Sequence, residues 1–394
     1  MPLVPYDDHS GIVYDVDLDA PPRERWIEAA GQFGDKVHKL LAHVDEALDE
    51  HLLSETSPHW RSILSPLIGV AKPLAGLATR YFGQDYAMEI RGISDAVGAP
   101  YGDLAVANII YDLHQASQSC GACSSASFIT RSGKPVLARN LDWSVPDSVG
   151  EHTVICRFHR RGGFYTSIGV AGFVGVLSAQ RNGAWAATLN QAPASESTTQ
   201  WTQTPACMHL RAACDRSMTF ASLIRKIMTW QTMSPFFAHV VGTERHEQVV
   251  VNGFGTEYSK RHAECGVLVQ TNHFVHDDDE HLNPTRGVFE EDGELVYEGT
   301  YPRYDALVRR MKKQKPATIE AAQRLLKGPP VTHEDTMQSM VLCPSASRIM
   351  LSVRPNEEWA AKDWYCESCG RSIHVFQGPG DYECPYCDEN IVID

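Results

Sequence analysis

The chain has 394 residues, 43% of them hydrophobic, so it is long enough to bury a large core and to hold more than one domain. Its formal net charge of −14 argues against nucleic acid as the main partner, because phosphate binding requires a basic face. The N-terminus lacks the basic and apolar stretches of a secretory signal, and no run of about 18 apolar residues predicts a spanning helix. We therefore expect a cytoplasmic protein.

The segment before Cys123 is predicted to be helical. Apolar residues recur at helical spacing after Pro21 and Pro22 and predict an amphipathic helix. These residues are Trp26, Ile27, Ala30, Phe33, Val37, Leu40, Leu41, Val44 and Leu48. Residues 63–78 form a more continuously apolar stretch, interrupted by Pro66 and Pro73, which is typical of a buried helix pair.

Cys123 begins a predicted β-hairpin over residues 123–143, with its turn centred near Ser132-Gly133. This pairing would place Asp142 opposite Cys123, so that both side chains share a face. Arg139 would then lie on the other face and would need a bulge or a strong twist to approach the thiol. With that irregularity, a thiol, a guanidinium and a carboxylate converge at one strand end.

A thiol is a good nucleophile, but with a free pKa of about 8.5 it needs a base within reach. No cysteine–histidine pairing is obvious nearby. If the chain were cut between Ala122 and Cys123, the freed α-amine of Cys123 could take the thiol proton. Asp142 would anchor that amine, while Arg139 would favour the thiolate and steady the carboxylate. The alternative is that Cys123 is a small buried hydrophobic residue beside a structural ion pair of Arg139 and Asp142.

After the hairpin, strands and helices are both predicted. Short β-rich runs cover residues 153–158, 164–170 and 184–189, and polar turns separate them. Helical patterns follow around residues 220–230 and 304–311.

The C-terminal residues 358–394 contain two CxxC pairs, and residues 355–358 are predicted to form a linker into this region. The pairs are Cys366 with Cys369 and Cys384 with Cys387, separated by fourteen residues. Four thiolates at this spacing predict a zinc ribbon with a structural Zn²⁺; iron in a rubredoxin-like site and a pair of disulfides are the alternatives.

The remaining cysteines show no such pattern. Cys120 and Cys123 also form a CxxC, but no second pair lies at ribbon spacing and the expected cut would separate them. We expect the others to be buried thiols: Cys156, Cys207, Cys214, Cys265 and Cys343.

Several short motifs occur in an order and spacing that resemble one enzyme family. Besides the run from Ala138 to Asp142, they are Glu89-Ile90-Arg91-Gly92, Asp103-Leu104, Gly172-Phe173-Val174-Gly175, Thr188-Leu189-Asn190-Gln191 and Thr271-Asn272-His273. Over roughly residues 10–355 the chain resembles the acid ceramidases and N-acylethanolamine-hydrolysing acid amidases. These are similar to choloylglycine hydrolases and penicillin acyltransferases. The resemblance implies an α+β chain with the four-layer αββα fold of N-terminal nucleophile (Ntn) hydrolases.

The resemblance also implies roles for single residues. It assigns to Asn272 the donation of a side-chain hydrogen bond to the developing oxyanion, whereas on its own this residue could cap a turn. An arginine downstream also belongs to the pattern, and both Arg286 and Arg303 fit it. Acid-active relatives carry a glutamate near Gln191, and glutamine cannot titrate, which puts an acidic pH optimum in doubt.

These observations predict a self-processing cysteine amidase with catalytic residues Cys123, Arg139, Asp142 and Asn272. The predicted units are a helical segment over 1–122, a catalytic region over 123–357 and the ribbon over 358–394. The substrate would be a small N-acyl amide with a lipid-like acyl chain, hydrolysed through a Cys123 thioester. In resembling enzymes, helices of the region that contains residues 63–78 can approach membranes, which leaves association with a membrane surface open.

Two alternatives to the hydrolase remain. An acyltransferase would use an amine in place of water at the same site. A non-catalytic binding protein would keep the fold while its ribbon recruits a partner. The sequence carries no signal for the oligomeric state.

Overall fold

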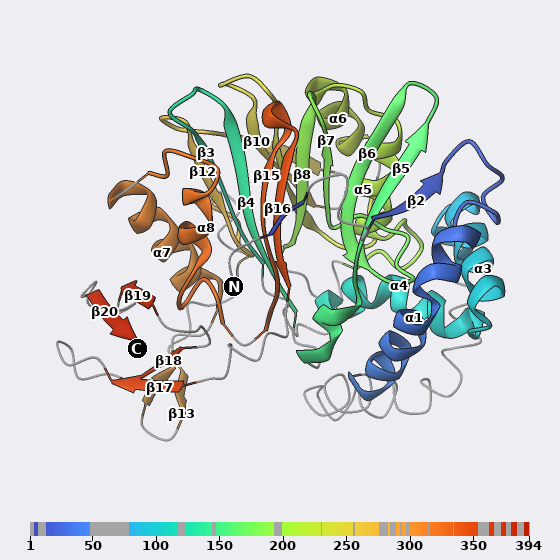
Figure 1. Ribbon diagram of the computed structural model, residues 1–394, viewed down its shortest axis with the longest axis horizontal. Coiled ribbons are helices and arrows are strands. Elements are labelled where there is room, and N and C mark those ends of the chain that lie inside the picture. Colours follow the sequence, from blue (N-terminus) through green and yellow to red (C-terminus); the bar gives the residue numbers. More distant parts are fainter. Residues whose placement is uncertain are drawn as a thin grey trace.

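The computed structural model describes residues 4–6, 13–47, 79–116, 123–143, 147–192, 199–229, 231–254, 257–275, 283, 289–291, 294–296, 299–313, 315–333, 335–353, 362–365, 372–375, 380–383 and 390–393. Two large β-sheets pack face to face at its centre (Figure 1).

The first sheet contains the hairpin that begins at Cys123. Within the described ranges its strand order is β1 (Val4–Tyr6), β16 (Arg348–Val353), β15 (Thr336–Cys343), β4 (Pro135–Asp142), β3 (Cys123–Ile129) and β12 (Val267–Gln270). Neighbouring strands in this order are antiparallel. Strand β3 is therefore hydrogen-bonded on both sides, by β4 and by β12.

The second sheet contains the strand runs expected after the hairpin. Its described strands are, in order, β11 (Glu257–His262), β10 (Gln248–Phe254), β9 (Phe236–Val241), β8 (Trp185–Gln191), β7 (Ser178–Arg181), β6 (Gly163–Val170), β5 (Thr153–Arg160) and β2 (Val13–Asp17). Strand β2 pairs in parallel with β5. The segment before Cys123 thus contributes strands as well as helices, β1 to one sheet and β2 to the other.

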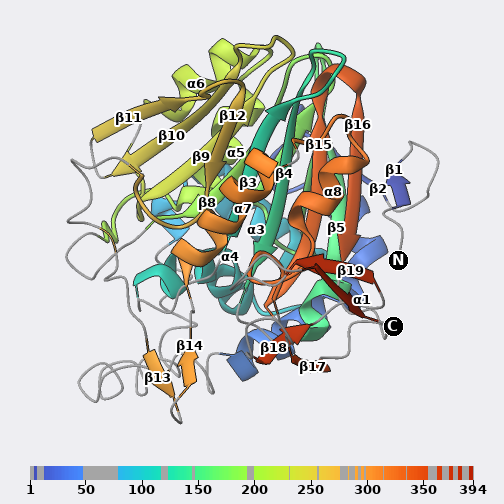
Figure 2. The same ribbon diagram turned by 90° about the vertical axis from the view of Figure 1, so that its left-hand side faces the viewer.

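Alternation along the strands separates the inner from the outer face of the first sheet. Leu137, Met340 and Leu342 pack in one cluster with Ile168 and Val241 of the second sheet. The outer face is covered by α7 (Thr300–Lys313) and α8 (Ala321–Leu326), which lie in front of it in Figure 2. A second hydrophobic cluster lies between this face and the two helices. It joins Ala126, Phe128, Val136 and Ala138 of the sheet to Leu307, Met311, Leu325 and Leu326 of the helices.

Helices also cover the outer face of the second sheet. Leu223 and Ile227 of α6 (Phe220–Ile227) belong to one cluster with Phe236 and Val249, and α5 (Ala206–Asp215) joins it through Cys214. The layer order is therefore helix, sheet, sheet, helix (Figure 1). The predicted αββα fold is confirmed.

The first predicted helix is present as α1 (Ile27–Ala47), with a kink at Phe33. Of the residues assigned to its apolar face, Trp26, Ala30, Phe33, Val37, Leu40 and Leu41 are buried. Ile27 is 50% exposed, so its assignment to that face was wrong. The side chain of Val44, Leu48 and the apolar residues 63–78 lie outside the described residues.

Helix α3 (Gln84–Val97) is joined to the second sheet's helices by buried charges. Glu89 Oε1 lies 2.8 Å from Arg25 Nη1 and 3.3 Å from Arg211 Nη2, and Glu89 Oε2 accepts a hydrogen bond from Trp26 Nε1 at 2.7 Å. Arg211 Nε also donates to Asp215 Oδ1 at 2.9 Å. The N-terminal segment and the region after Cys123 therefore share one buried ionic network.

Gly92 in the same helix allows a close approach of the chain. A Cβ atom at this position would lie 2.0 Å from the Arg23 carbonyl oxygen. The spacing of Glu89 and Gly92 thus serves the packing of α3 against the segment that enters α1. Helix α4 (Tyr101–Ala116) follows α3 and leads toward Cys123.

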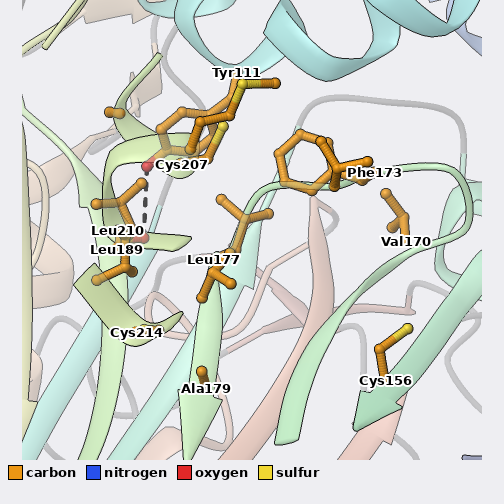
Figure 3. Packing of buried hydrophobic residues seen from close by; sticks show 14 of the residues in the cluster. Tyr111, Cys156, Val170, Phe173, Leu177, Ala179, Leu189, Cys207, Leu210 and Cys214 are labelled. Atoms are coloured by element: carbon orange, nitrogen blue, oxygen red, sulfur yellow. Dashed lines mark hydrogen bonds between the residues drawn. The ribbon is translucent and has the colours of Figure 1, made fainter. Parts of the chain in front are cut away.

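Four of the five cysteines expected to be buried thiols are buried and free: Cys156, Cys207, Cys214 and Cys343. The first three belong to the large core in Figure 3. Cys265 is exposed, contrary to the prediction. It occupies a turn before β12 in which it and Gly266 both have positive φ, of 50° and 74°. A turn of this kind presents its side chains to solvent.

Small hairpins complete the described elements. They are β13 (Phe289–Glu291) with β14 (Glu294–Val296), β17 (Lys362–Tyr365) with β18 (Ser372–Val375), and β19 (Gly380–Glu383) with β20 (Asn390–Ile393). Short 3-10 helices cover Thr79–Tyr81, Asp147–His152 and Pro344–Ala346. No helix within the described ranges is both long and apolar enough to span a bilayer.

Candidate active site

The hairpin that begins at Cys123 forms as predicted, but its register differs by one residue. Cys123 pairs with Leu141 rather than with Asp142, because residues 130–134 form a loop with an odd number of residues. Paired residues share a face, so Arg139 lies on the face of Cys123 and Asp142 lies on the opposite face. The prediction assigned these two faces the other way round. The ladder is continuous, and Arg139 reaches the thiol without a bulge.

Arg139 is fully buried and is directed at the sulfur. Its Nη2 donates to Cys123 Sγ at 3.4 Å and to the Leu189 carbonyl at 2.6 Å. Its Nη1 donates to the Leu177 carbonyl at 3.0 Å and to the Ser178 hydroxyl. These partners carry no formal negative charge. The guanidinium can therefore stabilise negative charge that develops on the sulfur.

Strand β12 brings Asn272 level with Cys123. Gln270 pairs with Ser125, so two further residues of antiparallel chain place Asn272 opposite Cys123. Asn272 Oδ1 accepts a hydrogen bond from the Cys123 backbone N–H at 2.7 Å, and its Nδ2 donates to the Gln191 carbonyl at 2.9 Å. An amide nitrogen has two protons, so one of them remains for another acceptor.

Helix α7 contributes Arg303, one of the two arginines that fitted the sequence pattern. Its Nη1 donates to the Cys123 carbonyl at 2.8 Å and to Ser124 Oγ at 3.0 Å. Its Nη2 donates to Asn272 Oδ1 at 3.0 Å. Arg303 thus fixes the Cys123 backbone and the Asn272 amide together. Arg286 lies outside the described residues.

Asp142 has cationic partners other than the predicted Arg139. Its Oδ1 accepts a hydrogen bond from the Thr336 hydroxyl at 2.6 Å. Its Oδ2 lies 3.3 Å from His333 Nε2 and 3.8 Å from Arg303 Nη1. Sequence reasoning missed His333 because this residue belongs to no motif. It reaches Asp142 only because β15 pairs with β4.

The second sheet holds β3 through a neutral histidine. The ring nitrogens of His239 lie 3.0 Å from Ser125 Oγ and 2.9 Å from Ser127 Oγ. Burial, assisted by the Arg261 charge, lowers the pKa of His239 to about 3. Asn190 Nδ2 donates to the same Ser125 hydroxyl at 3.2 Å. The strand that begins at Cys123 is therefore fixed to both sheets.

The thiol is buried in the large hydrophobic core, with Arg139 as its polar contact. Cys123 is 1% exposed, and Tyr111 and Trp143 form an edge-to-face pair with ring centroids 6.3 Å apart. Burial, and next the nearby Cys123, raise the pKa of Tyr111 well above its usual value, so this residue is a phenol rather than a base. Its hydroxyl donates to the Leu189 carbonyl at 3.5 Å (Figure 3). Among the described residues, the hydrogen-bond partner of the sulfur is Arg139, a donor.

Gln191 joins the site through its main chain. Its carbonyl accepts the hydrogen bond from Asn272, and its Nε2 donates to the Tyr111 carbonyl at 2.8 Å. The side chain is buried and neutral. A non-titrating amide therefore occupies the position near which acid-active relatives were expected to carry a glutamate.

An αββα sandwich is the layer order of the class of Ntn hydrolases, and Cys123 stands at the start of β3 in this one. Comparisons with known proteins agree with this class. A family model described as the beta subunit of N-acylethanolamine-hydrolyzing acid amidase matches residues 13–67. An N-acylethanolamine-hydrolyzing acid amidase of Caenorhabditis elegans is 25% identical over 252 residues, 61% of this chain and 66% of that relative. Acid ceramidase of Rattus norvegicus is 28% identical over 200 residues, 45% of each chain.

The chain is thus a relative of the N-acylethanolamine-hydrolysing acid amidases and acid ceramidases, as its motifs predicted. The matched region spans just under two thirds of the nematode relative and less than half of the rat one. A solved structure of the Caenorhabditis elegans amidase ortholog has a TM-score of 0.49 and 20% identity, covering 59% of this chain and 100% of that one.

Proposed function

We propose that the chain is a self-processing cysteine amidase that hydrolyses an N-acyl amide through a thioester on Cys123. The observation that carries the proposal is the convergence of three separate elements on one residue. Asn272 binds the Cys123 nitrogen, Arg139 binds its sulfur and Arg303 binds its carbonyl oxygen. All three polar groups of Cys123 are thus bound by side chains, which come from three different parts of the chain.

Cleavage between Ala122 and Cys123 would supply the base that the described side chains do not. The freed α-amine has an unperturbed pKa of about 8, close enough to neutral pH to take the thiol proton. Asp142 would anchor this amine. Its Oδ2 is buried and accepts no hydrogen bond among the described residues, so an acceptor is available.

The reaction would then proceed in two steps. The Cys123 thiolate attacks the amide carbon, and the spare Nδ2 proton of Asn272 binds the oxyanion. The C–N bond breaks, and the ammonium of Cys123 returns its proton to the leaving amine. Water, deprotonated by the same α-amine, next attacks the thioester. The carboxylic acid leaves and the thiol is restored.

Burial of Cys123 supports the assignment of the uncut chain as an inactive precursor. At 1% exposure, the sulfur is out of reach of an external substrate. Processing would therefore supply the base that the precursor lacks.

The substrate would be a small N-acyl amide with an apolar acyl chain. Two observations support this class. The relatives are named for N-acylethanolamine hydrolysis and as ceramidases. The described surroundings of the thiol include the aromatic pair of Tyr111 and Trp143.

We also propose a structural zinc ion bound by Cys366, Cys369, Cys384 and Cys387. The four cysteines lie outside the described residues, but the strands that flank them fit a ribbon. In sequence, the first CxxC connects β17 to β18 and the second connects β19 to β20. Two hairpins that each present a thiolate pair are typical of a closed tetrahedral zinc site.

Intact mass under denaturing conditions, followed across a range of pH, tests the function. We expect two fragments, one ending at Ala122 and one beginning at Cys123, and release of a fatty acid from an N-acylethanolamine. Cys123→Ala should give one uncut chain without activity, whereas the matched control Cys343→Ala should process normally.

Three outcomes would change the assignment. Product formation only in the presence of an added acceptor amine would indicate an acyltransferase. A wild-type chain that stays uncut and inactive at every pH would overturn the amidase proposal. In that case the binding-protein alternative would be favoured.

A further inference from the structure

The turn that enters β15 surrounds the Asp142 carboxylate. Thr336 donates its hydroxyl proton to Asp142 Oδ1 at 2.6 Å and in turn accepts a hydrogen bond from the His333 backbone N–H at 3.1 Å. The Thr336 N–H donates to the His333 carbonyl at 3.0 Å, and the Trp143 N–H donates to the Asp335 carbonyl at 2.8 Å. The turn is therefore fixed to the Asp142 side chain and to the backbone N–H of Trp143.

The same turn brings a titratable ring against the carboxylate. His333 Nε2 lies 3.3 Å from Asp142 Oδ2, and His333 Nδ1 lies 3.6 Å from Asp335 Oδ2. Arg303 is the third charged group that faces this ring, from α7, and it lies 3.8 Å from Asp142. The side chains of Asp142 and Arg303 are 0% and 5% exposed, whereas that of His333 is 23% exposed.

The charges around His333 favour its protonated form. Burial lowers the pKa of the ring, but Asp142 and next Asp335 more than offset this effect, and Arg303 opposes them only in part. The result is a pKa of about 9. At neutral pH the ring is an imidazolium, and above about pH 9 it becomes neutral.

The positive charge of Arg303 is shared between Asp142 and other groups, because Arg303 also binds the Cys123 carbonyl, Ser124 and Asn272. His333 contributes its charge to Asp142 and to Asp335. Resting on the function proposed above, we infer that His333 is a positioning residue which, as a cation, orients the Asp142 carboxylate to anchor the freed amine of Cys123. It acts on the reacting atoms only through Asp142.

His333→Gln tests this role through the pH profile of kcat/KM. The imidazolium disfavours a second positive charge on the adjacent amine of Cys123, so its loss should move the acidic limb of the profile to higher pH. We expect a displacement of about one pH unit, equal to a roughly tenfold loss of kcat/KM on that limb. Above about pH 9 the two profiles should converge, because the wild-type ring is then neutral as well.

Two further variants separate a charge effect from a structural one. His333→Lys restores a cation and should return the acidic limb toward its wild-type position. His159→Gln is the matched control, because His159 also contacts a carboxylate, Asp15, but lies on β5. Its profile should overlay that of the wild type.

A measurement independent of activity uses the uncut Cys123→Ala protein. Nuclear magnetic resonance should find one histidine with a pKa near 9, absent from the spectrum of the His333→Gln variant. Adding Asp142→Asn should lower that pKa. If the His333 ring has an ordinary pKa and Asp142→Asn leaves that pKa unchanged, the ion pair is refuted. This test holds even if His333→Gln fails to fold.

The outcomes distinguish this inference from the proposed function. If the wild type is processed and active and His333→Gln has the same pH profile of kcat/KM, the inference is refuted but the proposed function stands. A wild type that neither cuts itself nor hydrolyses an N-acylethanolamine would refute both.

Discussion

At the scale of single residues, Cys123 is held by its backbone as firmly as by its side chain. Its N–H is bound by Asn272 and its carbonyl by Arg303, while Arg303 also binds the Asn272 amide oxygen. The three residues come from β3, from the chain just after β12 and from α7. The position of the sulfur therefore depends on long-range contacts that are already made before any cut.

Asn272→Ala tests the part of this arrangement assigned to the oxyanion. The variant removes the spare Nδ2 proton, and loss of one such donor typically costs about a hundred- to a thousand-fold in kcat. Steady-state kinetics on processed protein should show this loss in kcat with KM little changed, because the apolar contacts that bind the substrate remain.

The matched control is Asn252→Ala. Asn252 is also a buried, hydrogen-bonded asparagine, but its partner is Ser259 in the pair of β10 and β11. Its kcat should equal that of the wild type. An Asn272→Ala enzyme of normal kcat would mean that another group binds the oxyanion.

At the scale of elements, the hairpin shows what local sequence can and cannot define. Alternating strands around Ser132-Gly133 were sufficient to predict β3, β4 and their turn. The register was not predictable, because it depends on the Thr130 N–H and hydroxyl closing a loop onto Lys134. A shift by one residue exchanges the faces of Arg139 and Asp142, which is the error in the prediction.

Longer-range members of the site had weaker signals. Asn272 was found only through the resemblance, since nothing local shows that β12 pairs with β3. Arg303 could not be separated from Arg286 without the position of α7. His333 had no signal, because its role depends on β15 lying beside β4. Site residues that are distant in sequence require the sheet order, which local patterns do not contain.

The C-terminal hairpins give a prediction about metal content. We expect one zinc per chain by mass spectrometry of the elements, and loss of that zinc in a Cys366→Ser, Cys369→Ser double variant. Cys265→Ser is the control, since Cys265 is an exposed thiol outside the ribbon. Iron in place of zinc, or full metal content in the double variant, would contradict the proposed site.

The buried network around Glu89 gives a prediction about the connection between α3 and α5. Glu89→Gln keeps a partner for Trp26 but leaves the charges of Arg25 and Arg211 less compensated. Breaking a buried ion pair costs about 3 kcal/mol or more, so the free energy of unfolding should fall by about that amount. Urea denaturation of the uncut Cys123→Ala protein would measure it on one continuous chain.

The control for this variant is Asp95→Asn. Asp95 also pairs with an arginine, Arg23, but the two side chains are 50% and 52% exposed. Exposed pairs contribute at most about 1 kcal/mol, so this change should be small. Equal effects of both variants would show that burial of Glu89 does not matter.

At the scale of the whole molecule, stability should depend on pH through Asp112. This residue is fully buried on α4, and its Oδ1 accepts a hydrogen bond from the Ala206 N–H at 3.2 Å. Burial raises its pKa from 3.8 to about 6. The folded state therefore binds the proton more tightly, and stability falls as pH rises from about 4 to 6.

Asp112→Asn should remove this dependence. A pKa shift of this size corresponds to about 3 kcal/mol. The free energy of unfolding of the variant should therefore exceed that of the wild type by up to this amount at pH 7 and equal it near pH 4. Denaturation curves at a series of pH values in the Cys123→Ala background would measure the difference. A variant less stable than its parent at pH 7 would refute the assignment.

The pairing of β3 on both sides has a consequence for the chain end that processing would create. A free terminus normally samples many conformations, and fixing one residue costs about 1–2 kcal/mol of entropy. Here the pairing with Leu141 of β4 and the hydrogen bond to Asn272 already immobilise Cys123, so the new terminus would be ordered as soon as it forms. The amine and thiol would then meet at a high effective concentration in every catalytic cycle, without a search.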